Sequence, residues 1–407
     1  MSDVTAITIG GRPFDLGAVE YELTIQRGAA NTWDAPAASY CSLFVRTAQA
    51  VDFEVLQAGQ PMLVYRGGAL RFTGTISDVS VTHPVGKAIA RVSVRAMGNV
   101  SKLGSIFVGS GSWPAENAAL RASRIISEAG LEPDLNLDNG QDVTARAAGS
   151  QAALGLLSDL AQGCGASVFD DEAGRIVFQA YRNRINPAAS RMWGSYTTTW
   201  SATTGTWADQ TYANASTPAP VTLPAQGVVY EPQMSQQSAA IVNSVQVSYG
   251  TSSPQATITA TDANSISAYG TRRVTVTTNL SDSSDATDRA AAVLNAQSFP
   301  RWQIGNVDVR LDDLDAPTVA SVEAIKIGDR VLLTDIPQPS PVYSQLGVVE
   351  GYTETFRPNQ HRIVFSLSDP RSSFGTAAWS AISGTKTWGA VNAARKWFDI
   401  VNASDVN

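Results

Sequence analysis

Two nine-residue stretches decide the fold: 56-LQAGQPMLV-64 and 325-IKIGDRVLL-333 both place a glycine turn before an apolar strand. A long strand with an internal glycine follows each of them, at 70-LRFTGTISDVS-80 and at 347-GVVEGYTETF-356. After a loop, each unit ends in one more strand, at 90–96 in the first and 362–368 in the second. The order of strand, hairpin strand, loop and strand therefore occurs twice, which favours two related β-domains in one chain. Chance similarity is the alternative, because small β-domains often share such spacing.

The composition is typical of a β-rich globular chain. Charged residues make up 16% of the 407 residues, whereas an average soluble domain has about 25%. Ser, Thr, Gly and Val are abundant instead, as expected for short strands closed by turns. Hydrophobic residues at 43% exclude a disordered chain. The net charge of −7 argues against a protein that binds nucleic acid by neutralising phosphates.

Helical patterns replace strand patterns after residue 100. Apolar spacing and flanking Pro and Gly residues predict one helix over 114–129 and a second over 151–163. A hairpin is expected over 166–181, so this part of the chain predicts a small α+β domain. A further helix is expected after Asp282, and a polar linker over 312–319.

Motifs for catalysis, metal binding and membrane insertion are absent from the sequence. The two histidines, His83 and His361, are far apart, so the sequence offers no HExxH or paired-histidine metal site. Cys41 and Cys164 show no disulfide or CxxC spacing and are expected to be buried thiols. Residues 1–11 do not resemble a signal peptide, and no apolar run of about 18 residues occurs. We expect synthesis in a reducing cytoplasm and no cofactor.

Two carboxylate clusters are the remaining route to an enzyme. They are Asp170, Asp171 and Glu172 at a hairpin tip, and Asp312, Asp313 and Asp315 in the expected linker. A glycosidase needs two carboxylates that face each other across a cleft, whereas carboxylates at turns usually accept hydrogen bonds from nearby amides. The structural role is preferred over catalysis or calcium binding, and no enzymatic activity is expected.

Six tryptophans mark two unusual segments of the chain. They are Trp193, Trp200, Trp207, Trp379, Trp388 and Trp397. The strings 200-WSATTGT-206 and 379-WSAISGT-385 form a second internal repeat. Exposed tryptophans can stack on sugar rings or anchor a protein interface, where they bury a large area. Anchoring to the same chain or to a neighbouring subunit is favoured, and sugar binding is the alternative.

The stretch 260-ATDANSISAYGTRR-273 carries a D-x-x-S-I-x-x-Y-G-x-R string that resembles one found in phage tail proteins, particularly those of phages of actinobacteria. The I-x-x-G-D-x-V string at 325–331 is similar to the second barrel of phage tail hub proteins. The resemblance covers roughly residues 1–370. It implies an α+β, mostly β fold with two related β-barrel domains, two smaller α+β domains and Trp-rich extensions.

On this basis the chain divides into six parts. They are 1–100 with 226–250 (first β-barrel), 101–185 (α+β), 186–225 (Thr- and Trp-rich insertion), 251–311 (second α+β), 312–370 (second β-barrel) and 371–407 (Trp-rich extension). The resemblance implies a homotrimer in which two barrels per chain make a ring of six around a central channel. Such a ring matches a sixfold tail tube to a threefold tail tip and lets the genome pass during ejection.

The partners implied by the resemblance are a distal tail or tail tube protein, other minor tail and tail-tip proteins, and, in transit, the tape measure protein and genomic DNA. Stable nucleic-acid binding is not expected, and the implied location is the virion tail tip, after assembly in the host cytoplasm. The alternative function is a host-surface adhesin whose Trp-rich segments bind glycan. Loss of glycan binding on substitution of Trp200 and Trp379 would favour the adhesin.

Overall fold

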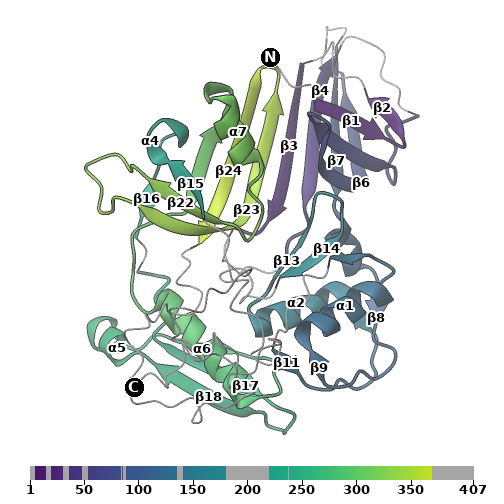
Figure 1. Ribbon diagram of the computed structural model, residues 1–407. Helices are drawn as coiled ribbons and strands as arrows, with labels where there is room; N and C mark the ends of the chain where they lie inside the picture. The colour runs from purple at the N-terminus through teal and green to yellow at the C-terminus, as the bar shows by residue number, and fades with distance from the viewer. Residues whose placement is uncertain are drawn as a thin grey trace, which may run out of the picture.

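The computed structural model describes residues 5–14, 20–30, 36–47, 54–83, 85, 89–134, 141–179, 220–236 and 238–368. A large sheet lies above two smaller α+β units (Figure 1). Its strand order is β15-β22-β23-β3-β4-β7-β6-β5-β1-β2, with β24 beside β23 and β21 beside β24. These strands are β1 (Thr5–Ile9), β2 (Arg12–Phe14), β3 (Glu20–Gly28), β4 (Tyr40–Thr47), β5 (Pro61–Arg66), β6 (Ala69–Thr82), β7 (Ala90–Met97), β15 (Val221–Pro224), β21 (Asn306–Arg310), β22 (Arg330–Thr334), β23 (Gln345–Arg357) and β24 (Gln360–Ser368).

Alternating side chains give the first half of the large sheet its core. In β7, Val92, Val94 and Ala96 are buried while the residues between them are exposed, as the twofold period of a strand requires. Leu23 of β3 and Phe356 of β23 lie in the same core. A side chain from the C-terminal part of the chain therefore completes the core of the N-terminal part.

The two repeated units share a backbone geometry. The Gly59 N–H donates to the Ile76 carbonyl over 2.8 Å, and the Gly328 N–H donates to the Val349 carbonyl over the same distance. The two glycines have φ of +90° and +91°, a conformation that favours glycine. A β-bulge directly follows Ile76 in β6 and Val349 in β23. We call β5, β6 and β7 the first repeat and β22, β23 and β24 the second repeat; their matched register confirms the repeated strand order.

Main-chain pairing between β3 and β23 joins the two repeats. Gly351 to Phe356 pair antiparallel with Gly28 to Leu23, so the sheet runs from one repeat into the other. Gly28 has φ of +74°, and a Cβ atom there would lie 2.3 Å from the Glu350 carbonyl oxygen. The mostly-β, α+β class is confirmed. The strands of both repeats lie in one continuous sheet, and the described strands form no closed barrel.

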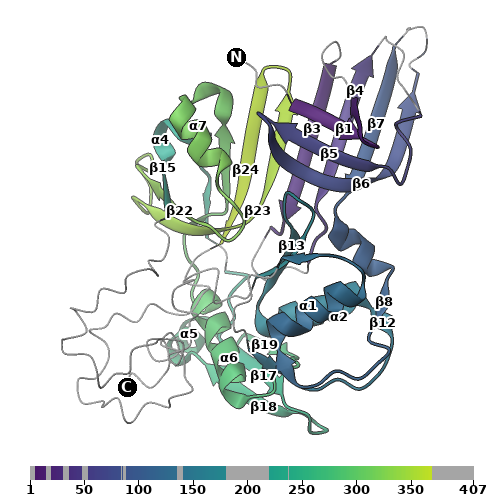
Figure 2. The same ribbon diagram turned by 45° about the vertical axis from the view of Figure 1, so that its right-hand side comes forward.

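The lower layer contains two α+β units that share one core (Figure 2). The first consists of η1 (Asn99–Gly104), β8 (Phe107–Val108), β9 (Glu116–Asn117), α1 (Ala118–Glu128), β10 (Pro133–Asp134), β11 (Asp142–Val143), β12 (Gln151–Ala152), α2 (Ala153–Cys164), β13 (Ser167–Asp170) and β14 (Ile176–Gln179). The second consists of β17 (Ser244–Tyr249), β18 (Ala256–Thr261), α5 (Ala263–Tyr269), β19 (Arg273–Val276) and α6 (Ser283–Gln297). Ile125 and Leu157 of the first unit belong to the same buried cluster as Val245 and Ala290 of the second.

Helix positions agree with the sequence patterns in type and differ at the ends. The predicted helices over 114–129 and 151–163 are α1 and α2, and the helix expected after Asp282 is α6. α1 begins only at Ala118, where the Asn117 side chain accepts a hydrogen bond from the Ala119 amide. α2 has no side-chain cap and ends at Gly165 in the left-handed conformation.

Two expected segments are corrected by the structure. Part of 226–250, expected in the first barrel, lies in the lower layer, because β17 pairs with β18 and β19. The expected linker 312–319 is helical: η5 (Leu311–Asp313) is followed by α7 (Ala316–Glu323). The Asp315 carboxylate begins α7 by accepting a hydrogen bond from the Thr318 amide, so an acidic run that suggested a linker is partly a helix cap. The remaining short elements are α4 (Ala225–Val228), β16 (Met234–Ser235) and β20 (Gln303–Ile304).

Candidate functional site

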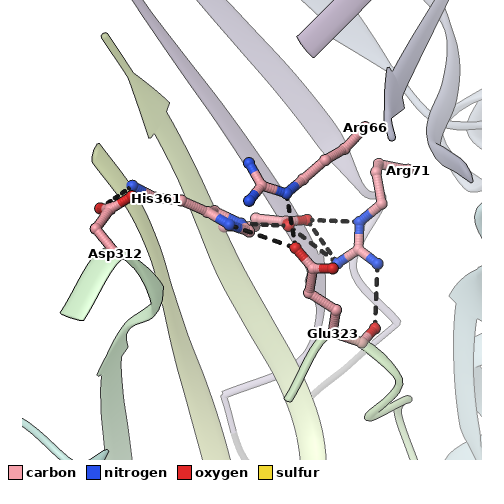
Figure 3. Close-up of polar contacts among 6 residues, drawn as sticks. Arg66, Arg71, Asp312, Glu323 and His361 are labelled. Carbon is pink, nitrogen blue, oxygen red and sulfur yellow. Dashed lines mark hydrogen bonds and ion pairs between the residues drawn. The ribbon is translucent and has the colours of Figure 1, made fainter. Parts of the chain in front are cut away.

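A cluster of charged side chains lies where the two repeats meet (Figure 3). The first repeat contributes Arg66 and Arg71, from the two strands of the β5–β6 hairpin. The second repeat contributes Glu354 of β23 and His361 of β24, and Glu323 comes from the end of α7. We call these five residues the junction cluster.

Glu354 is the centre of the junction cluster. Its side chain is fully buried, and the Arg71 guanidinium donates to both of its carboxylate oxygens, from Nη2 over 2.9 and 3.0 Å and from Nε over 3.1 Å. The His361 Nε2 atom lies 2.8 Å from Glu354 Oε1. The His361 ring in turn stacks on Phe356, with ring centroids 4.6 Å apart. Packing and hydrogen bonds thus hold both partners of the carboxylate in place.

Glu323 links the same groups from the other side. Arg66 Nε donates to Glu323 Oε1 over 2.6 Å, and Arg71 Nη1 donates to the Glu323 backbone carbonyl over 3.2 Å. The His361 Nδ1 atom lies 3.5 Å from Glu323 Oε1, and the His361 amide donates to the Asp312 carboxylate. Three segments distant in sequence, the β5–β6 hairpin, α7 and the β23–β24 hairpin, therefore meet through one set of charges.

The protonation of Glu354 reflects a competition between burial and its partners. Burial by itself raises the pKa of the Glu354 carboxyl, but the hydrogen bond from His361 and the charge of Arg71 outweigh it and hold the pKa below its usual range. The charge of Glu354 is among the factors that raise the pKa of Arg71. The cluster is therefore a charge-paired structure at neutral pH.

A pH dependence follows from this lowered pKa. The folded chain holds Glu354 ionised below the ordinary pKa of 4.5, so its stabilisation is present above that pH and is lost as the pH falls through the folded-state pKa. We expect the difference in free energy of unfolding between the wild type and Glu354→Gln to shrink between about pH 7 and about pH 3. Denaturant unfolding of both proteins across this range measures it. A difference that stays constant with pH would contradict the assignment.

A second buried carboxylate connects the large sheet to the first α+β unit. The Asp170 carboxylate accepts hydrogen bonds from the Ser39 amide over 3.0 Å and the Val100 amide over 2.7 Å. Burial raises the pKa of Asp170 despite these bonds. Arg27 of β3 donates to the Asp170 carbonyl over 3.0 Å and to the Arg71 carbonyl over 2.6 Å. Arg27 thus connects the hairpin of β13 and β14 to the neighbourhood of the junction cluster.

Four of the six carboxylates that the sequence offered as an alternative active site, all except Glu172 and Asp313, have structural partners. Asp170 is buried, and Asp171 accepts from the Arg175 amide and side chain. Asp312 accepts from the His361 amide, and Asp315 caps α7. Within the described ranges, no group of three or more His, Cys, Asp or Glu side chains could hold a metal ion.

The other sequence expectations have mixed outcomes. Cys41 and Cys164 are buried free thiols, as predicted. His83 is exposed, whereas sequence reasoning missed the role of His361 because its carboxylate partner lies on another strand. The tryptophans proposed as anchors, at 193, 200, 207, 379, 388 and 397, lie outside the described residues. No helix in the described part of the chain is long and apolar enough to cross a membrane.

The motif that carries the family resemblance has a structural role. Asp262 begins α5 by accepting a hydrogen bond from the Ser265 amide over 3.0 Å. The fully buried Asn243 donates to the Gly270 carbonyl over 2.8 Å and accepts from the Arg272 amide over 2.7 Å. Gly270 has φ of +73°. The D-x-x-S-I-x-x-Y-G-x-R string therefore specifies a capped helix and a tight turn on the side of β17.

Solved structures of other proteins share this architecture. Neither a family model nor a curated protein matches the sequence. The 43 kDa tail protein of prophage MuSo2 from Shewanella oneidensis is 15% identical with a TM-score of 0.61, and the match covers 91% of this chain and 98% of that one. The tail protein of Neisseria meningitidis is 10% identical with a TM-score of 0.58, covering 91% and 99%.

A prophage tail protein from Listeria monocytogenes is also similar, at 11% identity and a TM-score of 0.50, with 89% and 94% of the two chains covered. These matches extend over nearly the whole length of each relative, and so include both repeats and both α+β units. At such low identity the agreement concerns the arrangement of the backbone. The chain has the fold of phage tail proteins, the fold implied by its resemblance to that family.

Proposed function

We propose that this chain is a structural phage tail protein that forms the hub of the tail tip as a homotrimer. The observation that carries the proposal is the matched register of the two repeats, in which Gly59 and Gly328 make the same backbone hydrogen bond at the same φ. Three chains with two equivalent repeats each supply six equivalent units. A ring of this kind joins a sixfold tail tube to a threefold tip, because it has both symmetries.

The composition and the tail-protein fold support this proposal. With 16% charged residues the chain is poor in the groups that a fully solvated surface usually carries, and obligate subunit interfaces are comparatively apolar. The fold matches to tail proteins cover 91% of this chain, so they extend over both repeats and both α+β units. The partners are then the tail tube above and further tip proteins below, with the genome passing through the channel during ejection.

The charged groups of the described chain support a structural role over an enzymatic one. A catalytic carboxylate needs access to a substrate, whereas Glu354 and Asp170 are buried and hydrogen-bonded to protein donors. Asp171 and Asp315 stabilise a turn and a helix start. We therefore propose that the protein acts through assembly and has no catalytic activity.

Measurement of the mass and symmetry of the purified full-length chain tests the proposal. We expect a species of three times the 43.0 kDa chain mass in sedimentation equilibrium, and ring-shaped class averages with six peripheral lobes in electron microscopy. A stable monomer or dimer over the micromolar range, or particles without a ring, would contradict the hub assignment.

A further inference from the structure

One strand edge is paired in the second repeat and open in the first. In the second repeat, Gly351 to Phe356 of β23 pair with β24 on one side and with β3 on the other. The matching part of the first repeat is Asp78 to Thr82 of β6, which follows the equivalent bulge and pairs with β7. Among the described residues, no strand pairs with the other edge of Asp78 to Thr82.

The same difference appears in burial. Counting from the bulges, Val79 corresponds to Tyr352 and Val81 to Glu354. Tyr352 is 5% exposed and Glu354 is fully buried, whereas Val81 is 37% exposed. Structurally equivalent positions are therefore covered in one repeat and uncovered in the other. An uncovered valine beside an open strand edge is typical of a surface that pairs with another strand.

The open edge of Asp78 to Thr82 presents backbone N–H and C=O groups that a further strand could pair with. The Gly98 N–H donates to the Ser39 carbonyl, so Ala96, Val94 and Val92 of β7 direct their N–H and C=O groups toward β4 by alternation. Val79 and Val81, which lie opposite Val94 and Val92, therefore direct theirs toward the open edge.

The side chains of this edge offer little protection against pairing. The sequence from Asp78 to Thr82 contains neither Lys nor Pro, the residues that most often protect exposed edges, and its one charged side chain is Asp78 beside the bulge.

The second repeat contains a counterpart of β3 that has its own open edge. β3 lies beside β4, with Tyr21 opposite Val45 and Gln26 opposite Tyr40. The strand that corresponds to β4 is β21, which pairs with β24 as β4 pairs with β7. Val229 lies opposite Val309 of β21, and Met234 lies opposite Ile304 of the preceding β20. The two contacts are five residues apart in both cases, so Val229 and Met234 occupy the positions of Tyr21 and Gln26. Between them Glu231 has φ of +43°, which bends the segment 229–236 away from a regular strand.

This counterpart is also open on its outer side. Within the described residues, β16 pairs only with β20, which leaves its other edge without a strand. Figure 1 places β16 and β6 at opposite sides of the upper layer. A chain with two different complementary edges on opposite sides associates head to tail, and such contacts either close a ring or extend a filament.

We propose that the edge of β6 from Asp78 to Thr82 is an interface with a second copy of this chain, which adds its segment 229–236 as an antiparallel strand. The inference rests on the proposed function and names the surface through which the ring closes. The register follows from the junction within one chain: Thr353 lies opposite Gln26 and Glu354 opposite Ile25. Ser80 of one chain then lies opposite Met234 of the next, and Val81 lies opposite Gln233.

Disulfide cross-linking tests this register. The Ala29 amide donates to the Glu350 carbonyl, which makes Gln26 and Thr353 a non-hydrogen-bonded pair, with Cα atoms about 4.5 Å apart and within disulfide range. Ser80→Cys combined with Met234→Cys is therefore expected to give covalent trimers on oxidation. The native cysteines are buried and do not interfere.

Matched variants separate this interface from the hub assignment. The single cysteine variants should give at most a small fraction of cross-linked trimer. The same is expected of Ser80→Cys combined with Gln233→Cys, because those two cysteines face opposite sides of the sheet. Trimers by mass without cross-linking would overturn the interface and leave the hub in place. A long covalent ladder would support the interface and contradict the closed ring. A bond formed within one chain would overturn the interface.

Removal of one edge donor provides an independent test. Val81→Pro deletes an N–H that points to the open edge and leaves the pairing with β7 intact. We expect self-association to weaken about tenfold or more, because the partner carbonyl is left without a donor and the ring of proline obstructs the approach. Val81→Thr keeps the amide and should associate as the wild type does. Equal association of both variants, with circular dichroism showing both folded, would contradict the proposal.

Discussion

Replacing Glu354 with alanine is expected to lower the free energy of unfolding by about 3–5 kcal/mol, the range found when one partner of a buried ion pair is removed. Arg71 donates three hydrogen bonds to this carboxylate, and its side chain is only 12% exposed. The variant leaves this guanidinium with the Glu323 carbonyl and little access to water. Denaturant unfolding at a fixed protein concentration measures the loss, since self-association adds to the measured stability.

An exposed ion pair at the same junction serves as the control. Arg357 of β23 and Glu22 of β3 are 3.0 Å apart, and their side chains are 50% and 43% exposed. Glu22→Ala should cost less than about 1 kcal/mol, because water solvates the remaining arginine. Equal losses for Glu354→Ala and Glu22→Ala would show that burial of the junction cluster is not what makes it important.

Gly28→Ala is expected to lower the free energy of unfolding by about 2–5 kcal/mol, the sum of two costs. Gly28 has φ of +74°, which an alanine adopts with strain. Its new methyl group would meet the Glu350 carbonyl oxygen at 2.3 Å and the Ile327 side chain at 2.7 Å. One of the paired strands must shift, so the variant should weaken the joint between the two repeats.

A second glycine separates backbone strain from the clash. Gly68 has φ of +81°, and nothing lies within 4 Å of a Cβ atom built there. Gly68→Ala should therefore cost about 1–2 kcal/mol from strain alone. Hydrogen exchange adds a local measurement: in Gly28→Ala the amides of Tyr352 and Glu354 should exchange faster, while those of Val92 and Val94 keep their protection. Similar effects of both substitutions would contradict the close approach at Gly28.

The repeated strands could be predicted because their signals are local. A glycine at φ near +90° followed by a strand is encoded by a few adjacent residues, and both Gly59 and Gly328 have this conformation. The helix start at Asp282 was predictable for the same reason, since its side chain bonds the Ser284 amide two residues later. Local hydrogen bonds and periodicity act over a few residues, and the sequence displays them directly.

The junction between the repeats could not be predicted in this way. β3 and β23 are separated by some 330 residues. No local sequence pattern predicts which distant strand pairs with a given strand edge. The junction cluster has the same property: Arg71 and Glu354 are 283 positions apart. Neither histidine has a second histidine nearby in the sequence, so the sequence suggested no site at His361. Its carboxylate partner Glu354 becomes a neighbour only after β23 and β24 pair.

The acidic runs show a related limit. The stretch 312–315 suggested a solvated linker, yet Asp315 begins a helix and Asp312 bonds the amide of His361. Asp170 was expected at an exposed hairpin tip and is instead buried against two amides from other segments. Composition predicts solvation correctly only when a side chain has no donor nearby. The donors to Asp312 and Asp170 come from distant parts of the chain, whereas the donor to Asp315 is the amide three residues later.

The sequence by itself determined that this protein is mostly β, that it repeats one strand order, and that one of its motifs resembles a string found in phage tail proteins. These properties depend on periodicity, turn residues and caps, each of which acts within about one turn or hairpin. Only the tertiary structure decided that the repeats share one sheet, that their charges meet at Glu354, and that β6 keeps an open edge. These features depend on strand pairing between distant residues, and the free energy of such pairing belongs to the whole fold.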